Sequence, residues 1–297
     1  MNRRLFARQW LKLLRRAGFQ ACRAAACLLI ASQGGAQTLD LPPRSADALT
    51  GSQFLSVIGS MSRVERENWI YAQVASGNVP DFQRTLVPVT VSATIAGTAH
   101  TATYYAAPDY LAIGSDADYF MEPMTPLLAQ RLCNLLSCTL PTRKMVNQIW
   151  TNAAVKLAPQ PFSPDDYDIM SVKVFGLSNT AIRSKRNEQT NSHPLGALVG
   201  GDKKDVVISS KIYTNLSTPP KPVVIYGWHS TAGVPIQGLV NVHEETYMDY
   251  SHGIRLVQNA LTVDGAPNTI TNVLTTSSLA VLLSDEGVSE GTTSDGV

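Results

Sequence analysis

Several familiar functional signatures are missing from the 297-residue sequence. No internal repeat is present, which excludes a repeat architecture. The run Gly200–Asp205 lacks the spacing of a phosphate-binding P-loop and precedes a predicted strand, so it indicates a charged hairpin turn. The run Ile113–Asp118 has alternating acidic residues without a complete EF-hand loop, which disfavours calcium binding. The segment His243–His252 lacks the HExxH spacing of helical zinc sites.

Acidic residues are missing from the first 36 positions, which carry seven basic residues. A short apolar stretch, AAACLLIA, follows the basic region, and small residues surround Ala36. This order is typical of a secretory signal peptide cut near Ala36. The stretch is too short to span a bilayer, although a basic amphipathic anchor that stays attached remains an alternative. We therefore expect an exported protein, periplasmic or extracellular, with no integral membrane segment after signal removal.

The charge of the remaining chain bears on its partners. Seven of the 24 Lys and Arg residues lie in the first 36 positions, so a chain cut there keeps 17 against 23 Asp and Glu, a net charge of about −6. This balance argues against binding nucleic acid or an anionic membrane through bulk charge. Hydrophobic residues make up 44% of the sequence and charged residues 16%, which is a globular composition.

The order of predicted elements indicates an α+β fold, with helices and a β-hairpin first and a β-rich second half with a mixed or antiparallel sheet. We expect a linker over 37–50, one globular domain over 51–288 with a possible subdivision at the proline-rich loop 158–168, and a disordered tail over 289–297. Helical spacing covers 51–76, 126–136 and the segment after Thr142, a plausible N-cap. A hairpin turns at Ala96–Thr98, and a third strand follows it. Further strands are predicted at 171–176, 197–201, 204–213, 221–229 and 252–258, with a closing helix at 271–287.

Three of the five histidines fall within 24 residues: His229, His243 and His252. Histidine is the side chain best suited to exchange protons near neutral pH. His229 ends a strongly β-forming run, where a sheet edge commonly carries a site. His252 would share a strand face with Tyr250 and Ile254, whereas Ser251 would point away from it, so a Ser251–His252 nucleophile–base pair is geometrically poor.

The run Ser251-His252-Gly253-Ile254-Arg255 resembles the SHGCIR signature of the L,D-transpeptidases, which cross-link peptidoglycan in the bacterial envelope. In that family an earlier strand ends in a histidine, as Ile225–His229 does here. The resemblance covers about 30 residues and implies an envelope location, with His252, Gly253 and Arg255 matching the motif. The nucleophilic cysteine of the family has no counterpart, because Gly253 runs directly into Ile254.

Two cysteines remain after residue 36, and they allow two interpretations. Cys138 precedes a predicted helix and lies upstream of His252, an order that resembles papain-like and NlpC/P60-like hydrolases, in which a helix N-terminus lowers the thiol pKa. Alternatively, Cys133 and Cys138 form a structural disulfide, or are two small buried residues.

Two other interpretations of the histidine segment stay open. His229, His243, Asp249 and His252 are nitrogen and oxygen ligands of the type that zinc prefers, although no cofactor is required by the pattern. In the simplest interpretation, His243 lies in an exposed loop, His229 and His252 satisfy buried hydrogen bonds, and Tyr247 and Tyr250 pack.

The leading hypothesis is an exported hydrolase or acyl transferase that acts on a cell-envelope or extracellular polymer. His252 would be the acid or base, Asp249 or His243 would orient it or bind substrate, and the nucleophile would be Cys138 or a metal-bound water. Arg255 would hold an anionic group. The alternatives are a non-catalytic envelope protein that binds cell-wall peptide or glycan, and a purely structural secreted domain. The remaining site candidates are His229 as a second catalytic group and Trp228 and Tyr250 as substrate contacts.

Overall fold

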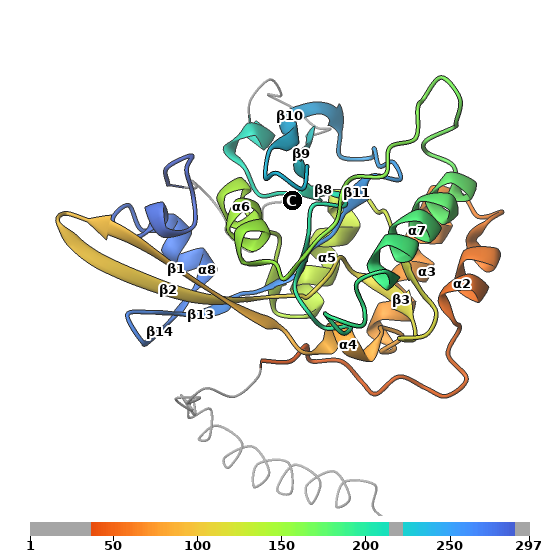
Figure 1. Ribbon diagram of the computed structural model, residues 1–297, viewed down its shortest axis with the longest axis horizontal. Helices are drawn as coiled ribbons and strands as arrows, with labels where there is room; N and C mark the ends of the chain where they lie inside the picture. Colours follow the sequence, from red (N-terminus) through yellow and green to blue (C-terminus); the bar gives the residue numbers. More distant parts are fainter. Residues whose placement is uncertain (1–36, 214–221, 289–297) are drawn as a thin grey trace, which may run out of the picture. The chain divides into compact units, whose positions relative to one another are not determined.

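The computed structural model describes residues 37–213 and 222–288. The fold is α+β, as the element order predicts, with most helices before most strands (Figure 1). The expected signal peptide and C-terminal tail lie outside the described residues. Residues 37–50, expected as a linker, pack against the rest of the described chain: Leu39 is buried, and its amide donates to the carbonyl of Arg84.

The N-terminal helical region holds two helices where helical spacing predicts one over 51–76. Helix α2 covers Gly51–Ile58 and helix α3 covers Arg63–Ala75. Ser62 starts the second helix, because its hydroxyl accepts the Glu65 amide while the Glu65 side chain accepts the Ser62 amide. This reciprocal cap stabilises a new helix start and thereby ends the first helix. A short helix α4 follows at Asp81–Arg84.

The larger sheet is six-stranded, with β14-β13-β2-β12-β5 in order and β1 paired to β2. The predicted hairpin is confirmed: β1 (Val87–Ile95) and β2 (Thr98–Ala106) are antiparallel and turn at Ala96–Gly97, both with positive φ. Its other strands are β5 (Cys138–Thr139), β12 (Val257–Gln258), β13 (Ala260–Val263) and β14 (Ala266–Thr269). Two two-stranded sheets are formed by β3 (Ala112–Gly114) with β4 (Tyr119–Met121) and by β6 (Val155–Lys156) with β7 (Val199–Gly200).

Three further helices pack among the sheets. Helix α5 covers Pro126–Leu135 and helix α6 covers Arg143–Asn152, and Thr142 caps α6 as predicted by accepting the Met145 amide. Helix α7 spans Val172–Asn187, so the prediction of a strand at 171–176 is wrong. Ser171 caps this helix through the Val174 amide, and this cap selects helix over the β-branched pattern of the sequence. The expected closing helix is short, α8 at Ile270–Thr275, followed by the 3-10 turn η2 at Ala280–Leu282.

The smaller sheet is mixed and has the order β10-β9-β8-β11. Its strands are β8 (Lys204–Val206), β9 (Pro222–His229), β10 (Pro235–Glu244) and β11 (His252–Gly253), and the 3-10 turn η1 (Ser210–Tyr213) follows β8. Strand β11 is parallel to β8, whereas β9 is antiparallel to both β8 and β10. All three candidate histidines belong to this sheet.

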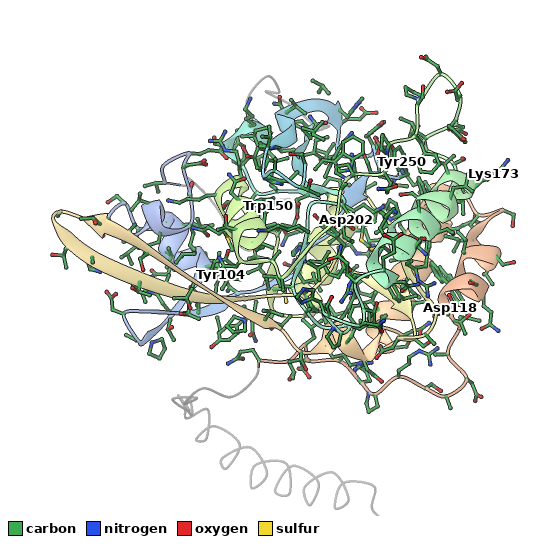
Figure 2. All side chains as sticks on the ribbon, viewed as in Figure 1. Tyr104, Asp118, Trp150, Lys173, Asp202 and Tyr250 are labelled. Atoms are coloured by element: carbon green, nitrogen blue, oxygen red, sulfur yellow. The ribbon has the colours of Figure 1, made fainter. Side chains whose placement is uncertain are left out.

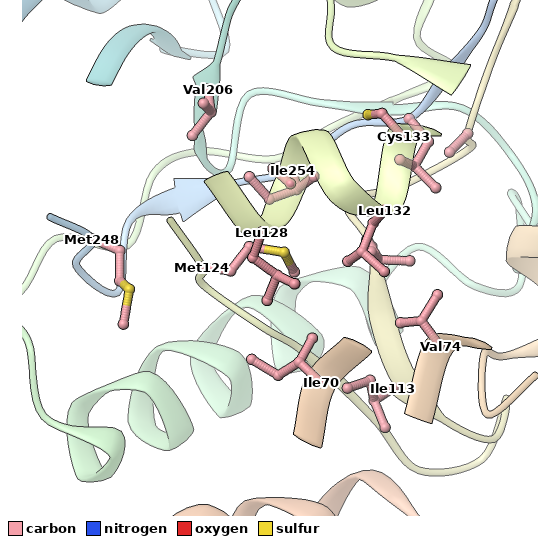
Figure 3. Close-up of a cluster of buried hydrophobic side chains, with 14 of the residues drawn as sticks. Ile70, Val74, Ile113, Met124, Leu128, Leu132, Cys133, Val206, Met248 and Ile254 are labelled. Carbon is pink, nitrogen blue, oxygen red and sulfur yellow. The ribbon is translucent and has the colours of Figure 1, made fainter. Parts of the chain in front are cut away.

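The main hydrophobic core surrounds helix α5, and one face of the smaller sheet closes it (Figure 3). Val206 of β8 and Ile254, which directly follows β11, lie beside Leu128 of α5. A separate small cluster, Val146, Val207, Val224 and Tyr226, covers the opposite face against α6. The smaller sheet therefore separates two environments, which fixes where its polar side chains lie. None of the described helices is long and apolar enough to cross a membrane.

Candidate functional site

The pairing register of the smaller sheet decides which face each polar side chain occupies. His252, Lys204 and Gly227 form one row across β11, β8 and β9, while Asp205 pairs with Tyr226 in the next row. Paired residues share a face and successive residues alternate. His252 and Lys204 therefore lie on the side of the main core, whereas Asp205 and Tyr226 face α6.

The end of β9 departs from this alternation. Gly227 and Trp228 both have positive φ, at 104° and 53°, a conformation that is uncommon for a tryptophan. The ring of His229 consequently contacts the ring of Tyr226, with 5.8 Å between their centroids, and lies on the α6 face. The four residues predicted as one site are thus divided, with His229 on the α6 face and His252 on the other.

His229 is fixed by helix α6. Its Nε2 lies 2.9 Å from Oδ1 of Asn147, which also accepts the Tyr226 hydroxyl at 3.0 Å. An amide oxygen only accepts hydrogen bonds, so Nε2 carries the imidazole proton and Nδ1 keeps its lone pair. Trp150 stacks on the imidazole with ring centroids 5.7 Å apart. A methyl group placed on Gly227 would lie 3.4 Å from both His229 Nδ1 and Asp205 Oδ2, so these two atoms border the same space.

Asp205 and Arg255 also line this space. The Tyr110 hydroxyl donates to Asp205 Oδ2 at 2.9 Å, and Arg255 Nε lies 4.0 Å from Asp205 Oδ1. Arg255 also donates to the carbonyls of Ala107 and Val199, and its guanidinium lies 4.2 Å from the centroid of the Tyr110 ring. Arg255 is 1% exposed, so its charge faces groups of the protein itself.

A small hollow lies between these side chains. We call it the His229 hollow, and it is lined by Tyr110, Val146, Ile149, Trp150, Gly200, Gly201, Asp205, His229 and Arg255. About 10 Å³ is open to the centre of a water-sized molecule. Burial lowers the pKa of His229 to about 4 and raises the pKa of Asp205 to about 7, although Arg255 opposes the second shift. At neutral pH the hollow therefore contains a neutral imidazole beside a carboxyl whose protonated form is favoured by burial.

The second group of predicted residues, which we call the His252 cluster, consists of His243, Tyr247, Asp249, Ser251 and His252. Tyr247 stacks on His243 with centroids 3.8 Å apart and meets the His252 ring edge-on at 5.6 Å. The Tyr247 hydroxyl donates to Asp249 Oδ2 at 2.9 Å, and the Ser251 hydroxyl donates to Asp249 Oδ1. Asp249 thus accepts hydrogen bonds from two hydroxyl groups, and the Ser251 hydroxyl is hydrogen-bonded to Asp249 and not to His252.

His252 is 1% exposed, and neither ring nitrogen has a hydrogen-bond partner. Burial lowers its pKa to about 4, although the Asp249 carboxylate favours the charged form. Burial alone would raise the pKa of Asp249, but nearby His252, the Ser251 hydrogen bonds and Lys204 together bring it below its usual value. The imidazole is therefore neutral above about pH 4 and lies beneath the half-buried Tyr247.

Cys133 and Cys138 are free thiols, so the disulfide suggested by their pairing is not formed. Burial raises the pKa of Cys138 to about 12 and raises the pKa of Cys133. The Cys138 thiol donates to the Leu136 carbonyl at 3.3 Å and belongs to β5 of the larger sheet, whereas His252 belongs to the smaller one. Such a thiol stays protonated at neutral pH, which argues against Cys138 as the nucleophile.

The two predicted aromatic contacts have structural partners. Tyr250 is buried, and its hydroxyl accepts the Phe162 amide at 2.7 Å, which fastens the proline-rich loop to the domain (Figure 2). Trp228 is half-buried and donates from Nε1 to the carbonyl of Asp202 at 3.1 Å, while Lys204 lies 4.8 Å from its ring centroid. Trp228 keeps an accessible part, whereas Tyr250 packs.

The predicted zinc ligands do not converge. Across the described residues no group of three or more His, Cys, Asp or Glu side chains is placed to hold a metal ion. Among the four predicted ligands, His229 is separated from the other three by the sheet itself.

The sequence interpretation missed Asp205, Tyr110, Trp150 and Asn147. Asp205 belongs to the run Gly200–Asp205, whose expectation as a charged hairpin turn is wrong, because β7 and β8 do not pair with each other, and Asp202, Lys203 and Asp205 are all buried. The high charge of this run hid its position, and only the alternation of β8 could have indicated that Asp205 faces inward.

Comparisons with known proteins identify no relative: no protein family, no curated protein and no solved structure matches this chain.

Proposed function

We propose that this protein is an exported hydrolase or acyl transferase that acts on a cell-envelope or extracellular polymer, with its reactive centre in the His229 hollow. One observation carries this proposal: the lone pair of His229 and the Asp205 carboxyl border one small space. Among the candidate histidines, His229 is preferred because His252 packs against Tyr247 and does not line the hollow.

The two groups suit opposite halves of a proton transfer. His229 has a pKa of about 4, so its imidazole is neutral at neutral pH and is free to accept a proton. Asp205 has a pKa of about 7, so a substantial fraction can donate a proton at that pH. A base and an acid whose pKa values are moved by burial are characteristic of sites for acyl transfer and hydrolysis.

Neighbouring side chains hold both groups in place. Asn147 and Trp150 from α6 fix the plane of the His229 ring, and Tyr110 fixes the Asp205 carboxyl. Arg255 supplies a buried positive charge that limits the rise in the Asp205 pKa. Asn147, Trp150 and Tyr110 are positioning residues, because each acts through His229 or Asp205.

The substrate class and the location rest on the sequence. The basic and apolar order of the first 36 residues supports export. The likeness of the Ser251–Arg255 run to the L,D-transpeptidase signature supports an envelope polymer. In this proposal Arg255 serves the carboxyl of Asp205 and not an anionic substrate group.

A second candidate function is non-catalytic binding of cell-wall peptide or glycan at the His252 cluster. The observation that favours it is the exposed His243 stacked on half-buried Tyr247. A flat aromatic surface of this kind, with polar edges, is suited to contact sugar rings or peptide side chains.

The test uses the purified full chain incubated with intact peptidoglycan, its soluble fragments and a set of amide and ester substrates. Products are identified by mass spectrometry. For any substrate turned over, His229→Gln should lower the rate by about 10²–10⁴-fold, the usual contribution of a positioned base. The matched control is His100→Gln, because His100 lies in the hairpin and pairs with Asp264.

Folding of each variant is checked by its thermal unfolding. A folded His229→Gln protein with the wild-type rate would remove His229 from the mechanism. Saturable binding of glycan or peptide by the wild type, weakened by Tyr247→Ala and accompanied by no turnover, would support the second candidate function instead.

A further inference from the structure

The His229 hollow has the size of one water molecule. Its open volume of about 10 Å³ is close to the smallest that a buried water occupies. Eight of its nine lining residues are buried, and Trp150 is half-buried, so Trp150 forms the wall towards solvent. An occupant of this hollow is small, and a substrate would approach it from the side of Trp150.

Two residues that line the hollow each have a buried donor without a hydrogen-bond partner, namely Arg255 Nε and Trp150 Nε1. Buried donors of this kind nearly always bond to protein or to ordered water. Arg255 Nε lies 4.0 Å from Asp205 Oδ1, which is too long for a direct hydrogen bond and is a separation that water commonly bridges.

Acceptors border the same space. His229 Nδ1 keeps a lone pair because Nε2 is bonded to Asn147, and Asp205 contributes carboxyl oxygens. A water molecule here would find two acceptors and a cationic donor, which meets the two to four partners that a buried water requires.

We propose that the His229 hollow binds a single water molecule between His229 Nδ1, Asp205 and Arg255 Nε, and that this water is the nucleophile of the reaction. The binding of water stands on the geometry alone, whereas its role as nucleophile rests on the proposed function. The site then acts as a hydrolase, and no protein nucleophile is needed in place of Cys138.

The step balances with these groups. The water oxygen forms a bond to the acyl carbon of an amide or ester, and one water proton passes to His229 Nδ1. The bond from the acyl carbon to the leaving nitrogen or oxygen breaks, and the protonated Asp205 supplies the proton that the leaving group takes. The proton on His229 then returns to Asp205, which restores both residues and leaves one carboxylic acid and one amine or alcohol.

The first experiment tests the water itself. A crystal structure of the full chain at a resolution that shows ordered waters should contain one water within about 3.2 Å of both His229 Nδ1 and an Asp205 oxygen. A hollow without density for water would overturn the proposal, whatever the result of the activity assay.

The second experiment uses a matched pair of variants. Val146→Ile adds one methylene at a lining residue, whereas Val207→Ile adds the same group in the same apolar cluster away from the hollow. Val146→Ile should no longer bind the water, and its rate should fall at least tenfold. Val207→Ile should bind the water and keep the wild-type rate. If Val146→Ile does not fold, Asp205→Asn replaces it, and its rate should fall by a similar factor.

The third experiment follows the oxygen atom. Turnover in H₂¹⁸O should place one ¹⁸O in the carboxyl product. Products without ¹⁸O, from a protein whose hollow holds the water, would overturn the nucleophilic role alone. Full activity of Val146→Ile with the water displaced would also overturn that role, whereas an inactive His229→Gln variant would still support the proposed function.

Discussion

The stability of the protein should depend on pH through His252, and the size of the effect follows from its environment. An unfolded histidine has a pKa of about 6.5, whereas the pKa of folded His252 is about 4. Below pH 6.5 the unfolded chain therefore binds a proton that the folded chain does not. Stability is complete above the unfolded pKa and is lost as the pH falls towards the folded pKa.

The loss due to His252 between pH 7.5 and pH 4 should be about 3 kcal/mol, since one pKa unit corresponds to about 1.4 kcal/mol. The pH dependence of the total unfolding free energy will also contain contributions from other groups. Burial also raises the pKa of Asp202 and Asp205 to about 7 and that of Glu122 to about 8. Protonation of these carboxyls therefore stabilises the folded protein as the pH falls. The comparison with His252→Gln isolates the histidine, because the variant keeps the carboxyls.

The assay is urea unfolding followed by circular dichroism at several pH values from 4 to 7.5, for the wild type and His252→Gln. The difference in unfolding free energy between the two proteins should fall by about 3 kcal/mol towards pH 4. A difference that stays constant across this range would refute the argument that His252 is buried as a neutral imidazole.

Three further predictions concern packing, thiol reactivity and the proline-rich loop. Gly253→Ala should destabilise the protein by about 1–3 kcal/mol in urea unfolding, because its new methyl group would lie 2.5 Å from Tyr110 Cδ1 and 2.7 Å from Lys203 Cβ; the control Gly238→Ala meets no atom within 4 Å and should behave as wild type. Iodoacetamide at pH 8 should label Cys138 at least about a thousandfold more slowly in the folded protein than in urea, as measured by peptide mass spectrometry, because burial raises its pKa to about 12; equal rates would contradict that burial. Tyr250→Phe should cost about 1 kcal/mol and speed proteolysis within residues 158–168, since it removes the bond to the Phe162 amide, and an unchanged cleavage rate would mean that other contacts hold the loop.

Local chemistry explains which elements could be predicted. The β1–β2 hairpin follows from a β-branched run on each side of Ala96–Gly97, and the start of α6 follows from Thr142. Residues 171–176 mislead because their valines favour a strand, while the Ser171 cap and the packing of Val174 and Phe175 in the core select helix α7. Local propensity loses here to tertiary packing.

Part of the candidate site could likewise be predicted from local sequence, and part could not. His243, Tyr247, Asp249 and His252 come together within ten residues, so their grouping could be expected from the sequence. The His229 hollow collects groups from α6, β8, the end of β9 and the residues after β11. Such long-range proximity depends on the strand order β10-β9-β8-β11 and on the unusual backbone at Trp228, and neither is visible in a residue pattern.

The left-handed backbone at Gly227 and Trp228 has a consequence for how this protein could be engineered. By rotating the end of β9, it places one imidazole on each side of the smaller sheet, and of these two only His229 lines the small hollow. A substitution near His243 on one side should therefore leave the surroundings of Asp205 on the other side unchanged.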